Sequence, residues 1–215
     1  MAAPIQVGRF ALIEPRKTEN KSTLVPKGRS GHCSVADDKN LYVYGGYNPQ
    51  EGPMLVANGP ATYFVPSRQV MAELWKFNFA TNCWNKVEHE DIPKAAASAS
   101  LILKNGKLIA YGGTVFPFGH LMSNTLYVCD MKTFSWERLE TKGNSDQLPP
   151  RAYGQSTLSH DGYFYTFAGA VSFNSDPVSD LHRLELKTKT WEKLEPTGDI
   201  PRGRYKQEVI LVENR

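Results

Sequence analysis

Short runs of alternating apolar and polar residues recur along the chain and predict β-strands. The clearest runs cover residues 74–79, 126–131 and 181–186, where every second side chain shares one face. These faces carry Trp75, Phe77 and Phe79; Tyr127, Cys129 and Met131; and His182, Leu184 and Leu186. Glycine, proline, asparagine or aspartate interrupts the pattern at spacings of about 8–12 residues, and helix signals are nearly missing. The pattern therefore predicts an all-β chain.

The strand pattern repeats three times with a constant internal spacing. A run that ends on two small residues is followed by a leucine and then by a tryptophan. The copies are Gly45-Gly46 with Leu74 and Trp84, Gly112-Gly113 with Leu126 and Trp136, and Ala168-Gly169 with Leu181 and Trp191. The step from leucine to tryptophan is 10 residues in every copy, and the tryptophans are 52 and then 55 residues apart. This period indicates propeller blades or solenoid units, each of which buries itself only against its neighbours.

Each repeat resolves into four strands, which makes it a blade. The first strand follows a basic residue, the second ends at the small pair, the third contains the leucine, and the fourth opens at the tryptophan. The predicted first strands are 30–35 after Arg29, 95–103 after Lys94 and 152–158 after Arg151. The predicted blades span 29–92, 93–148 and 149–199. A tryptophan at one fixed place in each blade buries about 150–250 Å² against the next sheet, so we interpret the tryptophans as structural.

Two partial units flank the three blades. In the N-terminal segment 1–28, residues 9–14 predict a lone fourth strand, and within 200–215 the run 204–212 predicts the first strand of a further blade. Propellers usually have about 4–8 blades, so the chain is expected to form about half of a six-bladed ring. Half a ring leaves unpaired sheet edges, which are an aggregation hazard. The sequence is therefore either a fragment of a longer product or a chain that pairs with another, and we favour the fragment.

Charge and cysteine usage limit the partners and the compartment. The chain has 25 basic and 22 acidic residues and a net charge of +3, which gives no reason to expect nucleic acid or a membrane surface as a partner. Residues 1–27 lack the apolar core of a secretory signal, and no stretch approaches the roughly 18 apolar residues of a membrane span. Cys33, Cys83 and Cys129 are widely spaced, which suggests packed thiols in a reducing compartment. We expect a cytoplasmic or nuclear protein with no cofactor.

The paired glycines, the spaced aromatics and the tryptophans, at about 50 residues per unit, resemble the kelch repeat. Short sequence motifs narrow the resemblance to one branch of the kelch family, over roughly residues 27–212. They are Arg29 to Cys33, Tyr44 to Pro49, Glu73 to Trp75, Phe79 to Thr81, Gly112 to Thr114, Pro117 to Gly119 and Tyr153 to Gln155.

The resemblance implies a six-bladed propeller followed by a helical box that binds elongin B/C and cullin-2. It implies a ubiquitin-ligase substrate receptor that captures C-terminal degrons ending in glycine, with a further link to stress-kinase signalling through inhibition of a protein phosphatase. The last three blades and the box are not in this sequence, so elongin and cullin-2 are expected partners only where such a box exists.

A receptor for a C-terminal carboxylate needs fixed donors, and arginine suits this role because its planar fork binds a carboxylate bidentately. In a propeller, the loops that enter each first strand gather around one mouth of the channel. The candidate peptide-binding residues there are Arg29, Ser30, Tyr47, Arg151, Tyr153, Arg202, Arg204 and Tyr205. Pro150-Arg151 and Pro201-Arg202 resemble the element that supplies the pocket arginine in related degron receptors. The alternative is structural: each basic residue bonds carbonyl groups of the adjacent blade.

Two loops have features that the propeller fold alone does not require. About 15 extra residues lie between the second and third strands of the first blade, in the loop 47–71, and loops of this length are usually functional or disordered. Its apolar content argues against complete disorder, and Tyr63 and Phe64 are candidates to cover the channel mouth; a loop without function is the open alternative. The loop 114–124 carries Val115, Phe116, Phe118 and Leu121, and we expect it to line the same rim.

Two other classes of function compete with the receptor. An enzyme would need clustered chemistry, such as the grouped imidazoles of a copper site, but the five histidines are scattered. We therefore predict no enzymatic activity and no metal. A kelch scaffold that binds a folded signalling partner, such as a protein phosphatase or a component of a stress-kinase pathway, without ligase activity, is the closer rival and would use the same face.

Overall fold

The computed structural model describes residues 24–51, 70–172 and 174–212, and these residues form three four-stranded antiparallel sheets. The all-β prediction is confirmed, since the described residues contain one short 3-10 turn, Pro49–Glu51, and no longer helix. The predicted strand at 9–14 lies outside the described residues, as does most of the 47–71 loop with Tyr63 and Phe64.

The twelve strands follow the chain in order within each sheet. The first sheet contains β1 Ser30–Ala36, β2 Asn40–Tyr47, β3 Leu74–Asn78 and β4 Cys83–Val87. The second contains β5 Ser100–Lys104, β6 Lys107–Tyr111, β7 Leu126–Asp130 and β8 Trp136–Leu139. The third contains β9 Ser156–His160, β10 Tyr163–Gly169, β11 Val178–Glu185 and β12 Thr190–Leu194.

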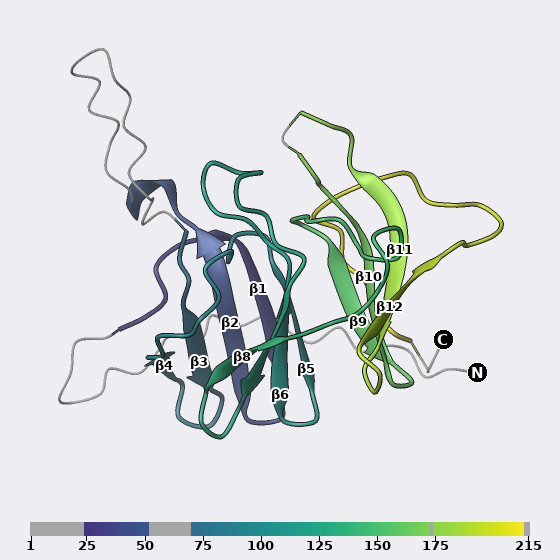
Figure 1. Cartoon of the computed structure of the whole chain (residues 1–215). Coiled ribbons are helices and arrows are strands. Elements are labelled where there is room, and N and C mark those ends of the chain that lie inside the picture. The colour runs from purple at the N-terminus through teal and green to yellow at the C-terminus, as the bar shows by residue number, and fades with distance from the viewer. Residues whose placement is uncertain (1–23, 52–69, 173, 213–215) are drawn as a thin grey trace, which may run out of the picture.

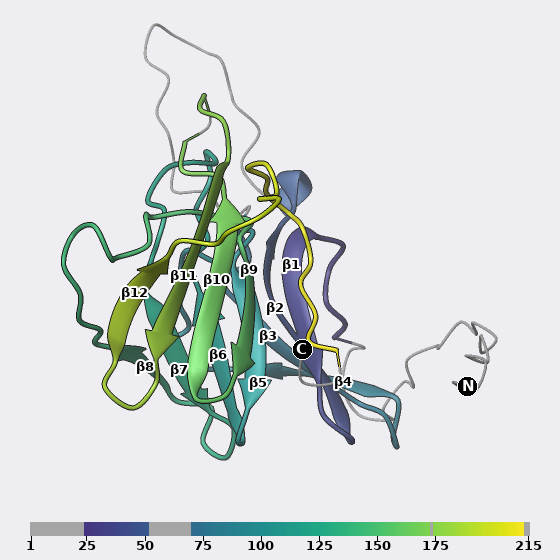
Figure 2. The same cartoon turned by 90° about the vertical axis from the view of Figure 1, so that its right-hand side faces the viewer.

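The sheets stand side by side as consecutive blades of a propeller. Their first strands contact one another in turn, with β5 between β1 and β9 (Figures 1 and 2). Tight hairpins close one end of the sheets, and the long connections gather at the opposite end, shown at the top of both views. The loops expected to carry the binding residues are therefore on one face.

Backbone hydrogen bonds link each first strand to the next around the propeller axis. Ser98 N donates to Gly31 O at 2.8 Å, Gly154 N to Ser98 O at 2.7 Å, and Lys206 N to Gly154 O at 2.7 Å. All four residues have positive φ, between 52° and 68°. Glycine adopts this conformation at little cost, whereas serine and lysine do so only where the surroundings hold them. The four residues are therefore equivalent positions of the repeat.

A second set of bonds explains the paired glycines. Gly46 N donates to Ala96 O at 2.9 Å and Gly113 N donates to Ala152 O at 3.0 Å, in each case across to the next sheet. A Cβ on Gly45 would lie 2.1 Å from the Ala96 carbonyl oxygen, closer than any real contact. The small residues are thus required because the next segment passes directly against them.

These bonds correct the predicted alignment of the basic residues. Arg29 corresponds to Ala96, Ala152 and Arg204, so Arg151 lies one residue before this position and Lys94 lies two before it. The predicted first strands 95–103 and 152–158 also begin too early: β5 begins at Ser100 and β9 at Ser156, and before them the pairing is reduced to isolated bridges such as Ala97–Thr114 and Tyr153–Ala170. The connections that lead into the first strands differ in length. The basic residue nearest to each strand therefore does not occupy the same position of the repeat.

Tryptophan wedges fill the spaces between the sheets. The ring of Trp136 lies 5.6 Å from that of Tyr44 in the first sheet, and the ring of Trp191 lies 5.8 Å from that of Tyr111 in the second. Tyr44 and Tyr111 occupy the same place, immediately before the small pair. Trp136 and Trp191 are buried in two apolar clusters, one at each junction. Trp84, by contrast, is half-buried and contacts Phe77 of its own sheet at 5.0 Å.

The segment after the third sheet occupies the place of a further first strand. Gly169 N donates to Arg204 O at 2.9 Å, and Gln207 Nε2 donates to Phe167 O at 3.0 Å. No strand is present among residues 204–212, where the sequence predicts one, because no second strand pairs with them. Phe167 is consequently half-buried, although its equivalents Tyr44 and Tyr111 are almost fully buried.

The wedges predict an unequal response to the same substitution. Trp191→Ala removes a side chain that is 2% exposed and fills a junction between sheets, so we expect a loss of about 3–5 kcal/mol in unfolding free energy. Trp84→Ala should cost clearly less, because this side chain is already partly exposed to solvent. Urea unfolding followed by circular dichroism measures both. Equal losses would contradict a wedge role confined to the junctions.

Candidate functional site

The candidate binding residues fall into two groups at the end of the sheets where the long connections gather. Arg29, Ser30 and Tyr47 belong to the first sheet, where Ser30 pairs with Tyr47 across β1 and β2. Arg151, Tyr153, Arg202, Arg204 and Tyr205 lie around the entry to and the exit from the third sheet. The two groups differ in how their arginine side chains are used.

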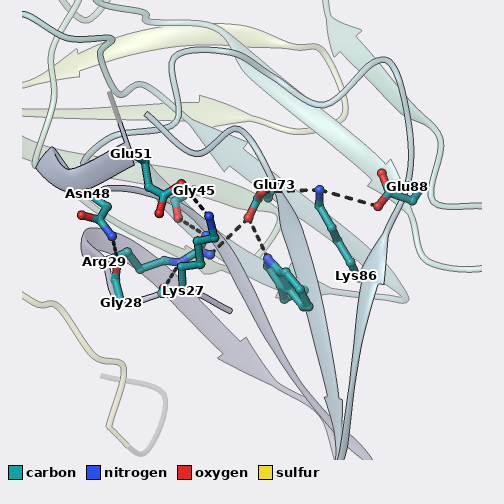
Figure 3. A network of polar contacts seen from close by, with 10 residues as sticks. Lys27, Gly28, Arg29, Gly45, Asn48, Glu51, Glu73, Lys86 and Glu88 are labelled. Carbon is teal, nitrogen blue, oxygen red and sulfur yellow. Dashed lines mark hydrogen bonds and ion pairs between the residues drawn. The ribbon is translucent and has the colours of Figure 1, made fainter. Parts of the chain in front are cut away.

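The Arg29 guanidinium is bonded within its own sheet (Figure 3). Its Nε donates to Lys27 O at 3.0 Å, Nη1 donates to Gly45 O at 3.1 Å, and Nη2 pairs with Glu73 Oε2 at 3.1 Å. The side chain is only 4% exposed. This arrangement matches the structural alternative for Arg29, since its donors hold the backbone beside the paired glycines.

Glu73 is the centre of this network. Trp75 Nε1 donates to Glu73 Oε2 at 2.8 Å, and Lys86 Nζ lies 3.4 Å from Oε1. Partial burial is the largest single influence on the pKa of Glu73 and raises it. The hydrogen bonds from Trp75 and Arg29 and the charges of Lys86 and Arg29 together outweigh burial and hold the pKa below its usual value. Glu73 is therefore a charged carboxylate that neutralises Arg29.

The arginines of the third-sheet group are exposed. Arg204 Nε donates to Arg202 O at 3.0 Å, the same local bond that Arg29 makes with Lys27 O. Within the described residues, no ion pair includes Arg151, Arg202 or Arg204. Their guanidinium groups are thus open to an external anion, which the Arg29 guanidinium is not.

Two tyrosines join the segments that carry these arginines. The rings of Tyr153 and Tyr205 lie 6.3 Å apart with an edge-on geometry. Tyr153 is 7% exposed and Tyr205 is 49% exposed, so a buried ring packs against a half-exposed one. Burial, and then the neighbouring Tyr205, raises the pKa of Tyr153, which keeps its hydroxyl protonated as a donor. The sequence places both tyrosines beside the arginines, but the contact between the two rings was not predicted.

An aromatic cluster on the same face connects the first two sheets. Tyr47 stacks on Phe116 at 5.4 Å and meets the edge of Phe118 at 4.9 Å. Leu121, in the same loop as the two phenylalanines, is 80% exposed. The sequence predicted that the loop 114–124 lines the rim, but the contact with Tyr47 was missed because it depends on how adjacent sheets meet.

The inner strands enclose a concavity of about 470 Å³ along the axis. Its walls are residues 31–34, 98–101, 154–157 and 206–208. Lys206 lies in this wall and was not among the sequence candidates. No signal for it is present in the sequence, because its equivalence to Gly31, Ser98 and Gly154 follows only from the backbone hydrogen bonds, and the four positions carry glycine, serine, glycine and lysine.

Other chemistry is limited in the part of the chain that the structure describes. It contains no group of three or more histidine, cysteine, aspartate or glutamate residues that could hold a metal ion. The three cysteines are free thiols, and burial raises the pKa of Cys129 to about 12, so this thiol is not reactive. No helix of the described segments is long and apolar enough to cross a membrane.

Three four-stranded sheets with tryptophan wedges and paired glycines define a kelch-type β-propeller. The family model of the KLHDC2/KLHL20/DRC7 Kelch-repeats domain matches residues 14–215, and the chain belongs to this kelch-repeat family. Members of the family are generally protein-binding modules without enzymatic activity.

The curated relatives agree with this assignment. Kelch domain-containing protein 10 of Xenopus tropicalis is 38% identical over 188 residues, which cover 86% of this chain and 43% of the relative. The human protein of the same name is 37% identical and is covered to 40% of its length. The chain therefore spans less than half the length of these relatives. The solved structure of YjhT superimposes with a TM-score of 0.61 over 82% of this chain and 54% of YjhT; at 19% identity it shows the fold alone.

The Glu73 network predicts a specific dependence of stability on pH. Because the folded pKa of Glu73 is lowered, its stabilising contribution is present above the ordinary glutamate pKa of about 4.3 and is lost as the pH falls through the folded value. We expect Glu73→Gln to cost about 2 kcal/mol near neutral pH and to flatten this acidic loss of stability. Urea unfolding across the acidic range measures both effects.

Glu140→Gln is the matched control, because this side chain is 77% exposed and pairs with Arg138 at the surface. It should leave both the stability and its pH profile unchanged. An acidic loss of stability as steep in Glu73→Gln as in the unsubstituted protein would show that Glu73 does not carry the effect.

Proposed function

We propose that this chain is the substrate-binding kelch module of a cullin-2 RING ubiquitin ligase, and that it captures protein C-termini that end in glycine. The ligand class follows from the family resemblance. The main observation that supports the site is that the third-sheet arginines are exposed and have no carboxylate partner among the described residues. In this proposal elongin B/C and cullin-2 are recruited by a separate helical box, and the protein acts in the cytoplasm or nucleus.

Arg151 and Arg204 supply the charge that the carboxylate needs. Their segments run side by side, since Lys206 N donates to Gly154 O at 2.7 Å and the Tyr153 and Tyr205 rings are in contact. An arginine fork gives two parallel, charge-assisted hydrogen bonds to a carboxylate. A terminal glycine suits this place because it has no side chain to separate the carboxylate from the arginines. Arg202 adds positive charge, and the half-exposed Tyr205 forms an aromatic wall.

The first-sheet candidates take a secondary part in this proposal. Arg29 holds the backbone through Glu73, while Ser30, which is exposed, and Tyr47 line the rim on the opposite side of the axis. We therefore assign the carboxylate to Arg151 and Arg204, and contacts with the rest of the peptide to Ser30 and Tyr47.

A second candidate function is a scaffold for a folded signalling partner, such as a protein phosphatase or a component of a stress-kinase pathway. The aromatic cluster of Tyr47, Phe116 and Phe118, with the exposed Leu121 beside it, favours this alternative. Apolar and aromatic side chains at an exposed rim are typical of protein interfaces. A scaffold would not depend on a free carboxylate in its partner.

The test compares two peptides that differ only at the C-terminus. We expect the full-length protein to bind a peptide with a free C-terminal glycine and to lose this binding when the carboxylate is amidated. Arg151→Ala should weaken binding by more than about 1.5 kcal/mol, roughly tenfold, because a charged hydrogen bond is lost. Isothermal titration or fluorescence anisotropy gives both affinities.

Arg138→Ala is the control, since Arg138 lies on the outer strand β8 and its side chain is 62% exposed. It should bind the free peptide as tightly as the unsubstituted protein does. Equal affinity for the free and amidated peptides would reject the carboxylate proposal and favour the scaffold.

A further inference from the structure

The two junctions between sheets differ in polarity near the end where the long connections gather. Between the second and third sheets, the third sheet presents Gln155, Thr166 and His182, all buried. The equivalent residues of the second sheet, at its junction with the first, are Ala99, Ala110 and Tyr127. The equivalence follows from the strand register, in which Thr166 pairs with His182 as Ala110 pairs with Tyr127. Buried glutamine, threonine and histidine side chains are therefore present at these positions of only one of the two junctions.

A small cavity lies against these polar side chains. Its volume is about 10 Å³, close to the lower limit of about 10–15 Å³ at which a single water molecule fits. Besides the three polar residues, its walls consist of Asp180, Tyr111 and the apolar residues Pro149, Pro150, Ala152, Ala168 and Val178. The cavity thus offers polar partners within a partly apolar wall and has the size of one water molecule, which are the two conditions for an ordered internal water.

Gln155 provides independent evidence of a missing partner. Its Nε2 donates to the carbonyl oxygen of Tyr111 at 2.9 Å, which fixes the orientation of the amide. Its Oε1 is buried and has no hydrogen-bond partner within the described residues. Gln207 makes the same bond to Phe167 O, and its Oε1 is likewise buried without a partner among the described residues. Both glutamines line the concavity along the axis, but only Gln155 also lines the small cavity between the sheets. A buried carbonyl oxygen without a donor is rare in folded proteins, because its desolvation is not compensated.

The other two polar residues are suited to bind the same water. The Thr166 hydroxyl both donates and accepts a hydrogen bond. Burial holds the pKa of His182 below its usual value, so near neutral pH the imidazole is uncharged, with one donor and one acceptor nitrogen. The nearby Asp180 is already paired with Lys193 at 3.1 Å. The cavity therefore presents a neutral mixture of donors and acceptors rather than a charge that would select an ion.

We infer that the cavity between the second and third sheets binds one ordered water molecule, which donates to Gln155 Oε1 and is held by Thr166 and His182. The site does not depend on the proposed degron function. It lies next to the candidate carboxylate site, however, because the cavity wall includes Pro150 and Ala152, the two neighbours of Arg151.

A crystal structure at high resolution tests the inference directly. We expect electron density for one water in the cavity, within hydrogen-bond distance of Gln155 Oε1. The combined variant Gln155→Ala, Thr166→Ala and His182→Tyr copies the residues of the first junction and should remove this density. An empty cavity in the unsubstituted protein, or a direct hydrogen bond from a protein group to Gln155 Oε1, would overturn the inference.

A solution measurement covers the case in which the combined variant does not fold. Water ¹⁷O relaxation dispersion counts long-lived internal waters, and we expect Gln155→Met, which keeps the side-chain length but loses the amide, to have one fewer than the unsubstituted protein. Ser34→Ala, in the open concavity, is the control and should leave the number unchanged. An unchanged number in Gln155→Met would contradict the proposed site.

Discussion

The structure depends on the hydrogen bonds that pass from the paired glycines of one sheet to the segment entering the next. Gly46 and Gly113 donate to Ala96 and Ala152, and these bonds fix the height at which each sheet meets its neighbour. Once this height is fixed, Tyr44 and Tyr111 stand opposite Trp136 and Trp191, and the apolar clusters form between them. The glycines allow two backbones to approach closely. They therefore stabilise the fold indirectly, through the side-chain packing that this approach permits.

The same bonds determine which arginines are available for binding. Arg29 and Arg204 occupy one position of the repeat, and each Nε bonds the backbone two residues earlier. In the first sheet, Glu73 lies beside this position and neutralises the arginine. Arg204 has no such carboxylate among the described residues and remains exposed. One repeated backbone position therefore carries a structural arginine in the first unit and a candidate ligand-binding arginine after the third.

The sequence was sufficient to predict the blades because their strands and wedges depend on local alternation and on constant spacing. Trp136 and Trp191 were correctly interpreted as structural for this reason. The prediction that they pack against the next sheet was wrong, because each packs against the preceding one, and Trp84 contacts its own sheet. The alignment of Arg151 with Arg29 and the starts of β5 and β9 were wrong, because the connections between blades differ in length and the register is set by bonds between distant residues. The pairing of Arg29 with Glu73, 44 residues away, depends on tertiary contact and leaves no periodic signal in the chain.

Amide hydrogen exchange at the paired glycines tests the central claim most directly. The amides of Gly46 and Gly113 are bonded to carbonyls of the next sheet and lie at buried positions, so they should exchange as slowly as the central amides of β2 and β6. The exposed hairpin glycines Gly106 and Gly162 should exchange rapidly and provide the internal comparison. Exchange at Gly46 and Gly113 as fast as at these hairpins would contradict the account, because the sheets would then not be held together at the glycine pairs.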